Sequence, residues 1–166
     1  MWTSPGLTVI ARGGIAWGAI GSDAARGRWQ RLYHRLEVWR GQAEDPYFTF
    51  LHLDALHQRL ELQPAYFFLL ADYSRLDPNI SWKNRAFREL IAQTGAVHPI
   101  GIHPSYAASK DPVRMAAEID RLAQILGRPV FRSRQHFLLL RFPDTYRQLL
   151  QAGIREDYTL GYADQP

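Results

Sequence analysis

The sequence predicts an α/β fold in which parallel β-strands alternate with α-helices. Segment 65–70 is a run of six apolar residues rich in aromatic side chains, as expected for a strand that is buried on both faces of a parallel sheet. Other short apolar runs are separated by segments whose apolar residues recur at helical spacing. The turns between them contain only a few residues. This alternation favours right-handed crossovers that place the helices outside a parallel sheet.

The composition limits the classes of protein and partner. The chain has 166 residues, of which 46% are hydrophobic and 22% are charged, so we expect a single domain over 1–166 with a substantial core. The net charge is +4, and Lys83 and Lys110 are the only lysines. Arginine therefore supplies nearly all of the positive charge, and it suits planar or anionic partners. Because no basic stripe interleaved with aromatic residues is present, we expect no nucleic-acid partner.

The hydropathy pattern bears on the membrane. No stretch of the sequence reaches the ~20 apolar residues of a membrane span, so we expect no transmembrane segment. The fairly apolar opening segment 1–21 lacks the charged start of a signal peptide and contains Arg12. We therefore expect a cytoplasmic location.

The first part of the chain predicts a strand at 7–10 and a basic helical insertion at about 22–42. The strand closes on a glycine turn at 13–14. In the insertion, an apolar stripe at helical spacing leaves much of the surface to five arginines, namely Arg26, Arg28, Arg31, Arg35 and Arg40. Such a helix either covers an anionic ligand or surface, or presents an ordinary solvated face, and we favour the second interpretation.

From residue 50 onward, apolar periodicity and stop signals delimit the elements. Gly95 and Gly127 follow the last residues of two helical stripes, where glycine commonly ends a helix. Asp111 precedes Pro112 in the pattern of a helix N-terminus. In chain order, we expect a helix at 50–60, a strand at 65–70, a helix from 82 to Gly95, a strand at 100–103, a helix at 112–126, a strand at 130–137, a helix at 143–150 and an extended segment at 157–162.

Polar side chains follow four of the predicted strands. They are Asp72 with Tyr73, the segment 103–106, the segment 134–136 and the segment 157–162. In a parallel sheet or barrel, the carboxyl ends of the strands meet at one rim, where ligands bind. The sequence therefore predicts a site at this rim. No glycine-rich phosphate loop occurs at any predicted strand–helix junction, which weakens a nucleotide-binding interpretation.

The residue types at the predicted rim suit a limited chemistry. His103 or His136 can serve as a general acid or a metal ligand. Arginine at 132 and 134 can hold a carboxylate or an oxyanion, and Asp72 or Asp157 can orient an imidazole. The tyrosines suit the faces of sugar rings. Alternatively, the arginines and Asp157 form a structural ion-pair network, and a lone histidine at a strand end is satisfied by a neighbour.

Five segments together resemble a known family. They are Phe67–Tyr73, Pro99–Tyr106, Arg132–Phe137, Phe142–Tyr146 and Ala152–Tyr162. In order and spacing they resemble the polysaccharide-deacetylase-like bacterial proteins of the NodB-homology group. The resemblance covers roughly residue 45 to the end. It implies a partial or distorted β/α barrel in which a divalent metal, usually zinc, activates water against the N-acetyl group of an amino sugar.

The resemblance and the rim pattern define the candidate site. We expect His103 to be a metal ligand. The expected catalytic residues are Arg134, His136 and Asp157. The expected substrate-binding residues are Asp72, Tyr73, Ser105, Tyr106 and Tyr162.

Two positions depart from the family pattern. The paired aspartates of the first motif are replaced by Ala11-Arg12-Gly13-Gly14, and the second histidine of the second motif by Ala107. Two functions therefore stay open. One is a hydrolase that removes N-acetyl groups from a polysaccharide or amino sugar, and the other is a non-catalytic carbohydrate-binding or scaffold protein. Because the chain predicts fewer strands than a complete barrel, we also expect an incomplete domain whose sheet edge is covered by a second copy or a partner chain.

Overall fold

The computed structural model describes residues 21–43 and 49–161, which fall into two compact units, Met1–Gln63 and Pro64–Pro166. The predicted strand at 7–10 and Tyr162 lie outside the described residues. No helix in the described ranges has the length and apolar character needed to cross a membrane.

The described part of the first unit is helical. It contains a helical segment at 21–25, α3 (Trp29–Arg40) and α4 (Phe50–Arg59). Asp23 is buried and pairs with Arg28 at 3.0 Å and with Arg35 at 2.7 Å. The hydrogen bond from Arg35 lowers the pKa of the Asp23 carboxyl. Two of the five arginines in the basic segment therefore make ion pairs within the unit.

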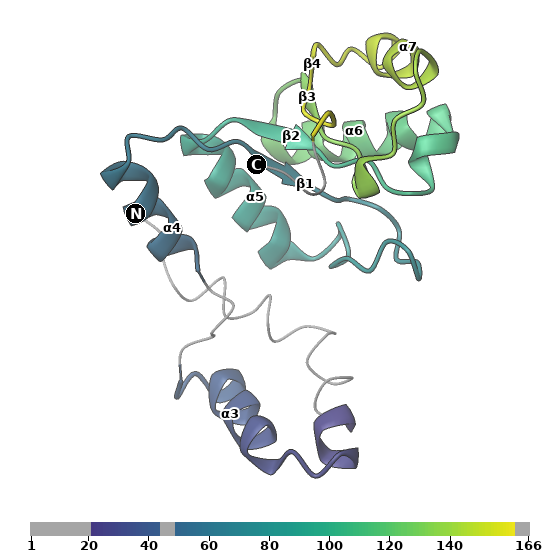
Figure 1. Ribbon diagram of the computed structural model, residues 1–166. Coiled ribbons are helices and arrows are strands. Elements are labelled where there is room, and N and C mark those ends of the chain that lie inside the picture. The colour runs from purple at the N-terminus through teal and green to yellow at the C-terminus, as the bar shows by residue number, and fades with distance from the viewer. Residues whose placement is uncertain (1–20, 44–48, 162–166) are drawn as a thin grey trace. The chain divides into compact units, whose positions relative to one another are not determined.

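The second unit is a parallel sheet with helices, which confirms the α/β class (Figure 1). All neighbouring strands are parallel and follow the order β1-β2-β3-β4. Phe68 is in register with Ile102, and Ile102 with Ser133. In chain order, the elements are β1 (Tyr66–Phe68), α5 (Arg85–Val97), β2 (Ile100–Ile102), η1 (Ala108–Lys110), α6 (Pro112–Leu126), β3 (Arg132–Ser133), η2 (His136–Leu138), α7 (Asp144–Gln151) and β4 (Glu156–Asp157).

The helix ends follow from capping chemistry. The Asp111 side chain accepts hydrogen bonds from the backbone N–H groups of Val113 and Arg114, at 3.0 and 3.1 Å. Gly127 ends α6 with φ of 64°, a left-handed conformation that glycine adopts without steric cost. The Asn84 side chain caps α5 by accepting from Phe87 N–H at 3.0 Å. The helix therefore begins at Arg85 and not at the predicted position 82.

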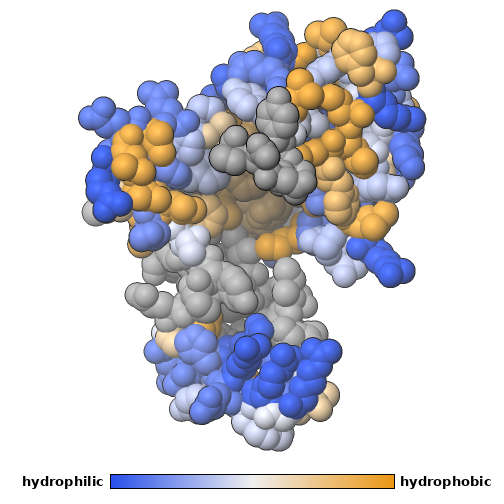
Figure 2. Space-filling view, viewed as in Figure 1, coloured by the Kyte–Doolittle hydropathy of each residue, from blue (hydrophilic) through white to orange (hydrophobic). Residues whose placement is uncertain are grey.

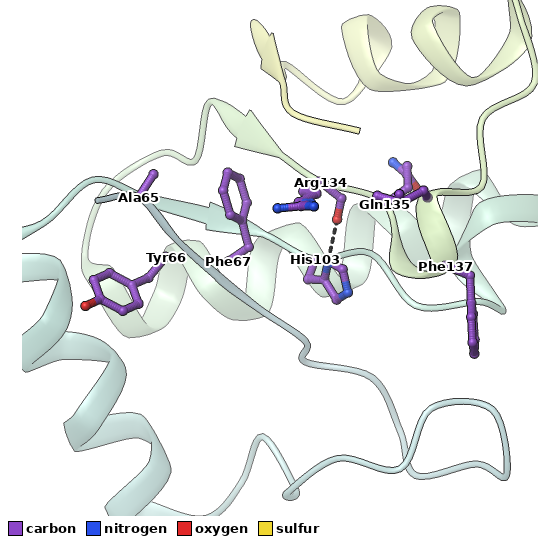
Figure 3. Close-up of a pocket in the computed structure, with 8 residues that line it drawn as sticks. Ala65, Tyr66, Phe67, His103, Arg134, Gln135 and Phe137 are labelled. Carbon is purple, nitrogen blue, oxygen red and sulfur yellow. Dashed lines mark hydrogen bonds between the residues drawn. The ribbon is translucent and has the colours of Figure 1, made fainter. Parts of the chain in front are cut away.

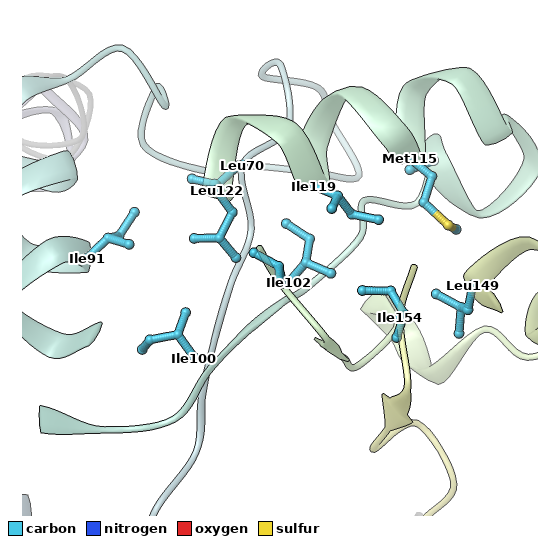
Figure 4. Close-up of a cluster of buried hydrophobic side chains, with 11 residues drawn as sticks. Leu70, Ile91, Ile100, Ile102, Met115, Ile119, Leu122, Leu149 and Ile154 are labelled. Atoms are coloured by element: carbon cyan, nitrogen blue, oxygen red, sulfur yellow. The ribbon is translucent and has the colours of Figure 1, made fainter. Parts of the chain in front are cut away.

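A hydrophobic cluster joins the helices to the sheet. α5 packs against α6, and α6 packs against β2. Figure 4 shows the buried side chains between these elements, including Ile91, Ile102, Met115 and Leu122. Each of these four side chains is at most 1% exposed. Removal of this apolar surface from water is the main stabilising contribution to the second unit.

Apolar residues also reach the surface of the second unit. Phe142, Leu150 and Leu160 are each exposed by more than two thirds. Figure 2 shows apolar residues, in orange, gathered on the visible face of this unit near α7. This part of the surface is therefore not a uniformly polar, solvated face.

Gly101 lets an aromatic side chain lie across β2. A Cβ atom at this position would come within 2.5 Å of the Phe67 ring and 2.9 Å of Arg132 Cβ. Such distances are far below ordinary van der Waals contact, so only glycine fits here without displacing a neighbour. The position of the Phe67 ring, which contributes to the site described below, therefore depends on Gly101.

Candidate functional site

Two imidazoles meet at the carboxyl edge of the sheet. His103 follows β2, and His136 lies just beyond β3. His103 Nε2 is 3.0 Å from His136 Nδ1, and the ring centroids are 4.9 Å apart. Because β2 and β3 are parallel neighbours, residues just past their ends lie at the same edge. The structure thus brings together the two histidines that the strand-end pattern singled out.

Backbone hydrogen bonds hold both histidines in place. His103 N–H donates to the Phe68 carbonyl at 2.9 Å, and Arg134 N–H donates to the Ile102 carbonyl at 3.0 Å. His136 N–H donates to the Pro104 carbonyl at 3.2 Å. These bonds continue the pairing of the strands beyond their last regular residues, so the two side chains project from a fixed backbone.

The outer nitrogens of the two rings both face carbonyl oxygens. His103 Nδ1 is 2.6 Å from Arg134 O (Figure 3), and His136 Nε2 is 3.1 Å from Leu76 O. A carbonyl oxygen only accepts hydrogen bonds, so each outer nitrogen carries a proton. If both rings were neutral, their inner nitrogens would present two lone pairs to each other. A hydrogen bond between the inner nitrogens would then need a proton between them.

A buried carboxylate lies beside this pair. Asp77 is 1% exposed, and its Oδ1 is 4.0 Å from His136 Nε2. Asp77 also accepts hydrogen bonds from Tyr106 N–H at 2.7 Å and from the Ser74 hydroxyl at 3.0 Å. Asp77 thus places an acidic side chain beside the histidine pair. In the sequence, Asp77 indicates only a turn before Pro78, because its partners are distant along the chain.

Burial sets the protonation of His103. Burial lowers the pKa of the His103 imidazole, although the hydrogen bond to the Arg134 carbonyl opposes the shift. The His103 imidazole therefore stays neutral to a lower pH than an ordinary histidine.

A pocket of about 450 Å³ opens beside His103. Figure 3 shows Phe67, His103 and Arg134 extending into this region from the neighbouring strands β1 and β2 and the segment after β3. Gln135 and Phe137 also line the pocket. Phe137 has φ of 56°, a left-handed conformation that is uncommon for a non-glycine residue, and its side chain is 59% exposed. Residues in such sparsely populated backbone conformations are enriched at active sites and ligand-binding sites.

Gln135 contributes a buried amide to the pocket. Its exposed fraction is 0%, and neither its side-chain oxygen nor its nitrogen has a hydrogen-bond partner among the residues that the structure describes. Its backbone N–H donates to Thr159 Oγ1 at 3.0 Å. Buried polar atoms without partners are rare in proteins. The sequence places Gln135 between Arg134 and His136, but it does not indicate that the side-chain amide has no hydrogen-bond partner among the described residues.

Asp157 positions the segment that follows β3. Its Oδ1 accepts hydrogen bonds from the Ser133 hydroxyl at 2.6 Å and from the Thr159 hydroxyl at 2.7 Å. The Thr159 hydroxyl in turn accepts from Gln135 N–H. Asp157 therefore orients the backbone around Arg134 and His136, and it does not line the pocket.

The other predicted substrate-binding residues in the described ranges do not line the pocket. Asp72 accepts from Arg121 at 3.1 Å and from the Trp82 indole at 3.3 Å, while Tyr73 is exposed. Tyr106 lies edge-on to Phe137, with ring centroids 6.0 Å apart. Tyr106 is therefore the predicted ring-stacking residue that is placed near the pocket.

Ser105 faces the interior of the unit. Its backbone N–H and hydroxyl donate to the Glu118 carboxyl, at 2.9 and 2.6 Å. Glu118 is 1% exposed, and burial raises its pKa although the hydrogen bonds from Ser105 oppose the shift. The position of an acidic residue within the apolar stripe of α6 is the sequence signal that could have revealed this contact.

The described side chains supply two of the nitrogens that a zinc ion would need. No group of three or more His, Cys, Asp or Glu side chains in the described ranges could hold a metal ion. The outer nitrogens of His103 and His136 face carbonyl oxygens, as in many metal sites. A catalytic zinc site needs about three protein ligands. The described residues therefore do not complete one.

Comparisons with protein-family models, with curated proteins and with solved structures give no match for this chain.

Proposed function

We propose that the second unit is a carbohydrate-active hydrolase of the polysaccharide deacetylase type, which removes N-acetyl groups from an amino sugar. The observation that carries the proposal is the contact between His103 and His136 beside an aromatic-walled pocket. The family resemblance supports it, since the same segments supply these residues. The proposal includes the fold that the resemblance implies, a partial or distorted β/α barrel. The parallel sheet of the second unit would form part of that barrel.

The histidine pair suits the proton transfer that amide hydrolysis needs. Water adds to the acyl carbon, the C–N bond breaks, and the leaving amine nitrogen takes up a proton. His103 lines the pocket and contacts His136, so a proton held by this pair would lie beside a bound substrate. Transfer of this proton to the amine would be general acid catalysis, which contributes about 10²–10⁴-fold in enzymes.

The pocket walls suit a sugar ring. Phe67 and Phe137 line the pocket with aromatic surface, against which the C–H face of a pyranose packs. Divalent metal chemistry, which the resemblance implies, would supply water activation when the ion is bound. Because the described ligand set is incomplete, the proton transfer proposed here does not depend on that ion.

A second candidate is a carbohydrate-binding protein without catalysis. This candidate is favoured by the pocket lining, because none of the described residues that line the pocket has a carboxylate that could act as a base. The same aromatic walls would then bind a sugar without acyl transfer.

Acetate release separates the two candidates. The 166-residue chain is incubated with N-acetylglucosamine oligomers, with and without added zinc, and acetate and binding are both measured. We expect acetate release that is lost in His103→Gln and His136→Gln. The matched control is His52→Gln, an exposed histidine of α4. Oligomer binding without acetate release under either condition would establish the binding protein and overturn the hydrolase.

A further inference from the structure

We infer that the pocket beside His103 takes an acidic sugar, and that Arg134 binds the carboxylate of that sugar. The inference rests on the proposed function for the acyl-transfer site and extends it to the charge of the substrate. It follows from the charges, the unsatisfied polar groups and the apolar walls of the pocket.

Arg134 is a cation without an acidic partner. Its guanidinium makes no ion pair or hydrogen bond with the part of the chain that the structure describes, although the residue is exposed and lines the pocket. Nearby arginines differ in this respect. Arg132 pairs with Glu156 at 2.8 Å, and Arg121 pairs with Asp72 at 3.1 Å. The side chain of Arg134 is therefore available to a ligand, whereas its neighbours are engaged in structural contacts.

The pocket has no negative charge to balance Arg134. The described residues that line it contribute aromatic, aliphatic, amide and imidazole groups, and none of them is Asp or Glu. A guanidinium in such surroundings favours an anionic ligand, and its planar fork binds a carboxylate through two parallel hydrogen bonds. Charge complementarity of this kind determines which ligands are accepted.

Gln135 adds a neutral hydrogen-bonding group next to Arg134. Because no hydrogen bond holds its amide among the described residues, a ligand that bonds to this amide displaces no existing hydrogen bond. An amide both donates and accepts, so it suits the hydroxyl groups of a sugar. The combination of guanidinium, amide and aromatic walls fits a sugar ring that carries a carboxylate better than it fits a small inorganic anion.

The test compares two oligosaccharides of equal length. One is an N-acetylglucosamine hexasaccharide, and the other alternates N-acetylglucosamine with glucuronate. Titration calorimetry with the 166-residue chain is expected to show roughly tenfold tighter binding of the acidic oligomer. The preference is expected to shrink with added salt. Inorganic phosphate is the competitor that reveals general anion binding.

The variants assign the preference to one side chain. Arg134→Met is expected to abolish the preference, while Arg134→Lys retains part of it because lysine keeps the charge without the fork. The matched control is Arg147→Met, which removes the same charge from a side chain on α7 that is 70% exposed and lies outside the pocket lining. A far-UV circular dichroism spectrum confirms that each variant is folded.

Several results would overturn the inference. One is equal affinity for the two oligomers. Another is an equal loss of the preference in Arg147→Met and Arg134→Met. The third is competition by inorganic phosphate that is as strong as competition by free glucuronate. Acetate release, measured in the same samples, separates this inference from the proposed function. Acid-selective binding without acetate release would overturn only the hydrolase, and acetate release without selectivity would overturn only the role of Arg134.

Discussion

His103 Nε2 lies 3.0 Å from His136 Nδ1, while the outer nitrogen of each ring faces a backbone carbonyl. The inner nitrogens of the two rings therefore face each other within hydrogen-bond distance. Asp77, buried at 4.0 Å from His136 Nε2, supplies the nearby negative charge. The three residues lie far apart along the chain. The parallel pairing of β2 and β3 brings the two histidines together.

We expect Asp77→Asn to destabilise the second unit by about 1–3 kcal/mol. The substitution keeps the shape of the side chain, but it removes the charge that accepts hydrogen bonds from Tyr106 N–H and the Ser74 hydroxyl. Urea unfolding measures the loss. The control is Asp120→Asn on the exposed face of α6, for which a change within about 0.5 kcal/mol is expected. An equal loss in both variants would contradict a special role for Asp77.

The sequence predicted the strand-end histidines but not Asp77. Helical spacing located α5 and α6, and Asp111 and Gly127 marked the ends of α6, because those signals are local. The predicted ends of α5 were wrong, since the helix begins at Arg85 and continues past Gly95 to Val97. The meeting of His103 and His136 followed from the parallel order of strands, which the alternation of elements favours. In contrast, Asp77 contacts Tyr106 N–H across 29 positions of the chain, and no local pattern encodes such a contact.

Strand lengths show the same limit. The predicted strands at 65–70 and 130–137 pair only at Tyr66–Phe68 and Arg132–Ser133. Leu70 is fully buried although it lies beyond the paired residues of β1. An apolar run therefore indicates which residues are buried, and burial continues past the last residues that pair between strands. The charged residues were equally ambiguous, since nothing in the sequence distinguishes the paired Arg132 from the pocket residue Arg134.

Glu118 predicts a pH dependence of stability. Because burial raises its pKa in the folded state, the folded chain holds this proton at pH values where the unfolded chain has lost it. Its contribution to stability is therefore complete below the ordinary pKa of 4.5 and falls as the pH rises through the folded-state value. Glu118→Gln, which cannot ionise, is expected to flatten this part of the profile. Thermal unfolding across a pH series tests it, and a profile identical to that of the native chain would contradict the assignment.

Gly101→Ala is expected to destabilise the unit by about 1–3 kcal/mol, because the added methyl group overlaps the Phe67 ring. Displacement of that ring would also deform the pocket, so sugar binding should weaken in parallel. Gly161→Ala is the matched control, since a Cβ atom there meets nothing within 4 Å. Chemical unfolding and oligomer titration are compared for the two variants. Wild-type stability in Gly101→Ala would show that the ring moves freely and does not form a fixed wall.

Thr159 connects Asp157 to the backbone that carries the site. Its hydroxyl donates to Asp157 Oδ1 at 2.7 Å and accepts from Gln135 N–H at 3.0 Å. Thr159→Val keeps the shape but leaves the buried Gln135 N–H without an acceptor, which costs about 1–3 kcal/mol. Thr159→Ser keeps the hydroxyl and is expected to retain most of the stability.

The same pair of variants tests the link to the site. If Asp157 acts by positioning the segment after β3, Thr159→Val should weaken sugar binding and shift the ring resonances of His136, while Thr159→Ser should do neither. Nitrogen-15 spectra of the histidine rings give the second readout. Loss of stability in Thr159→Val with unchanged His136 resonances would show that the hydrogen bonds stabilise the fold without orienting the histidine pair.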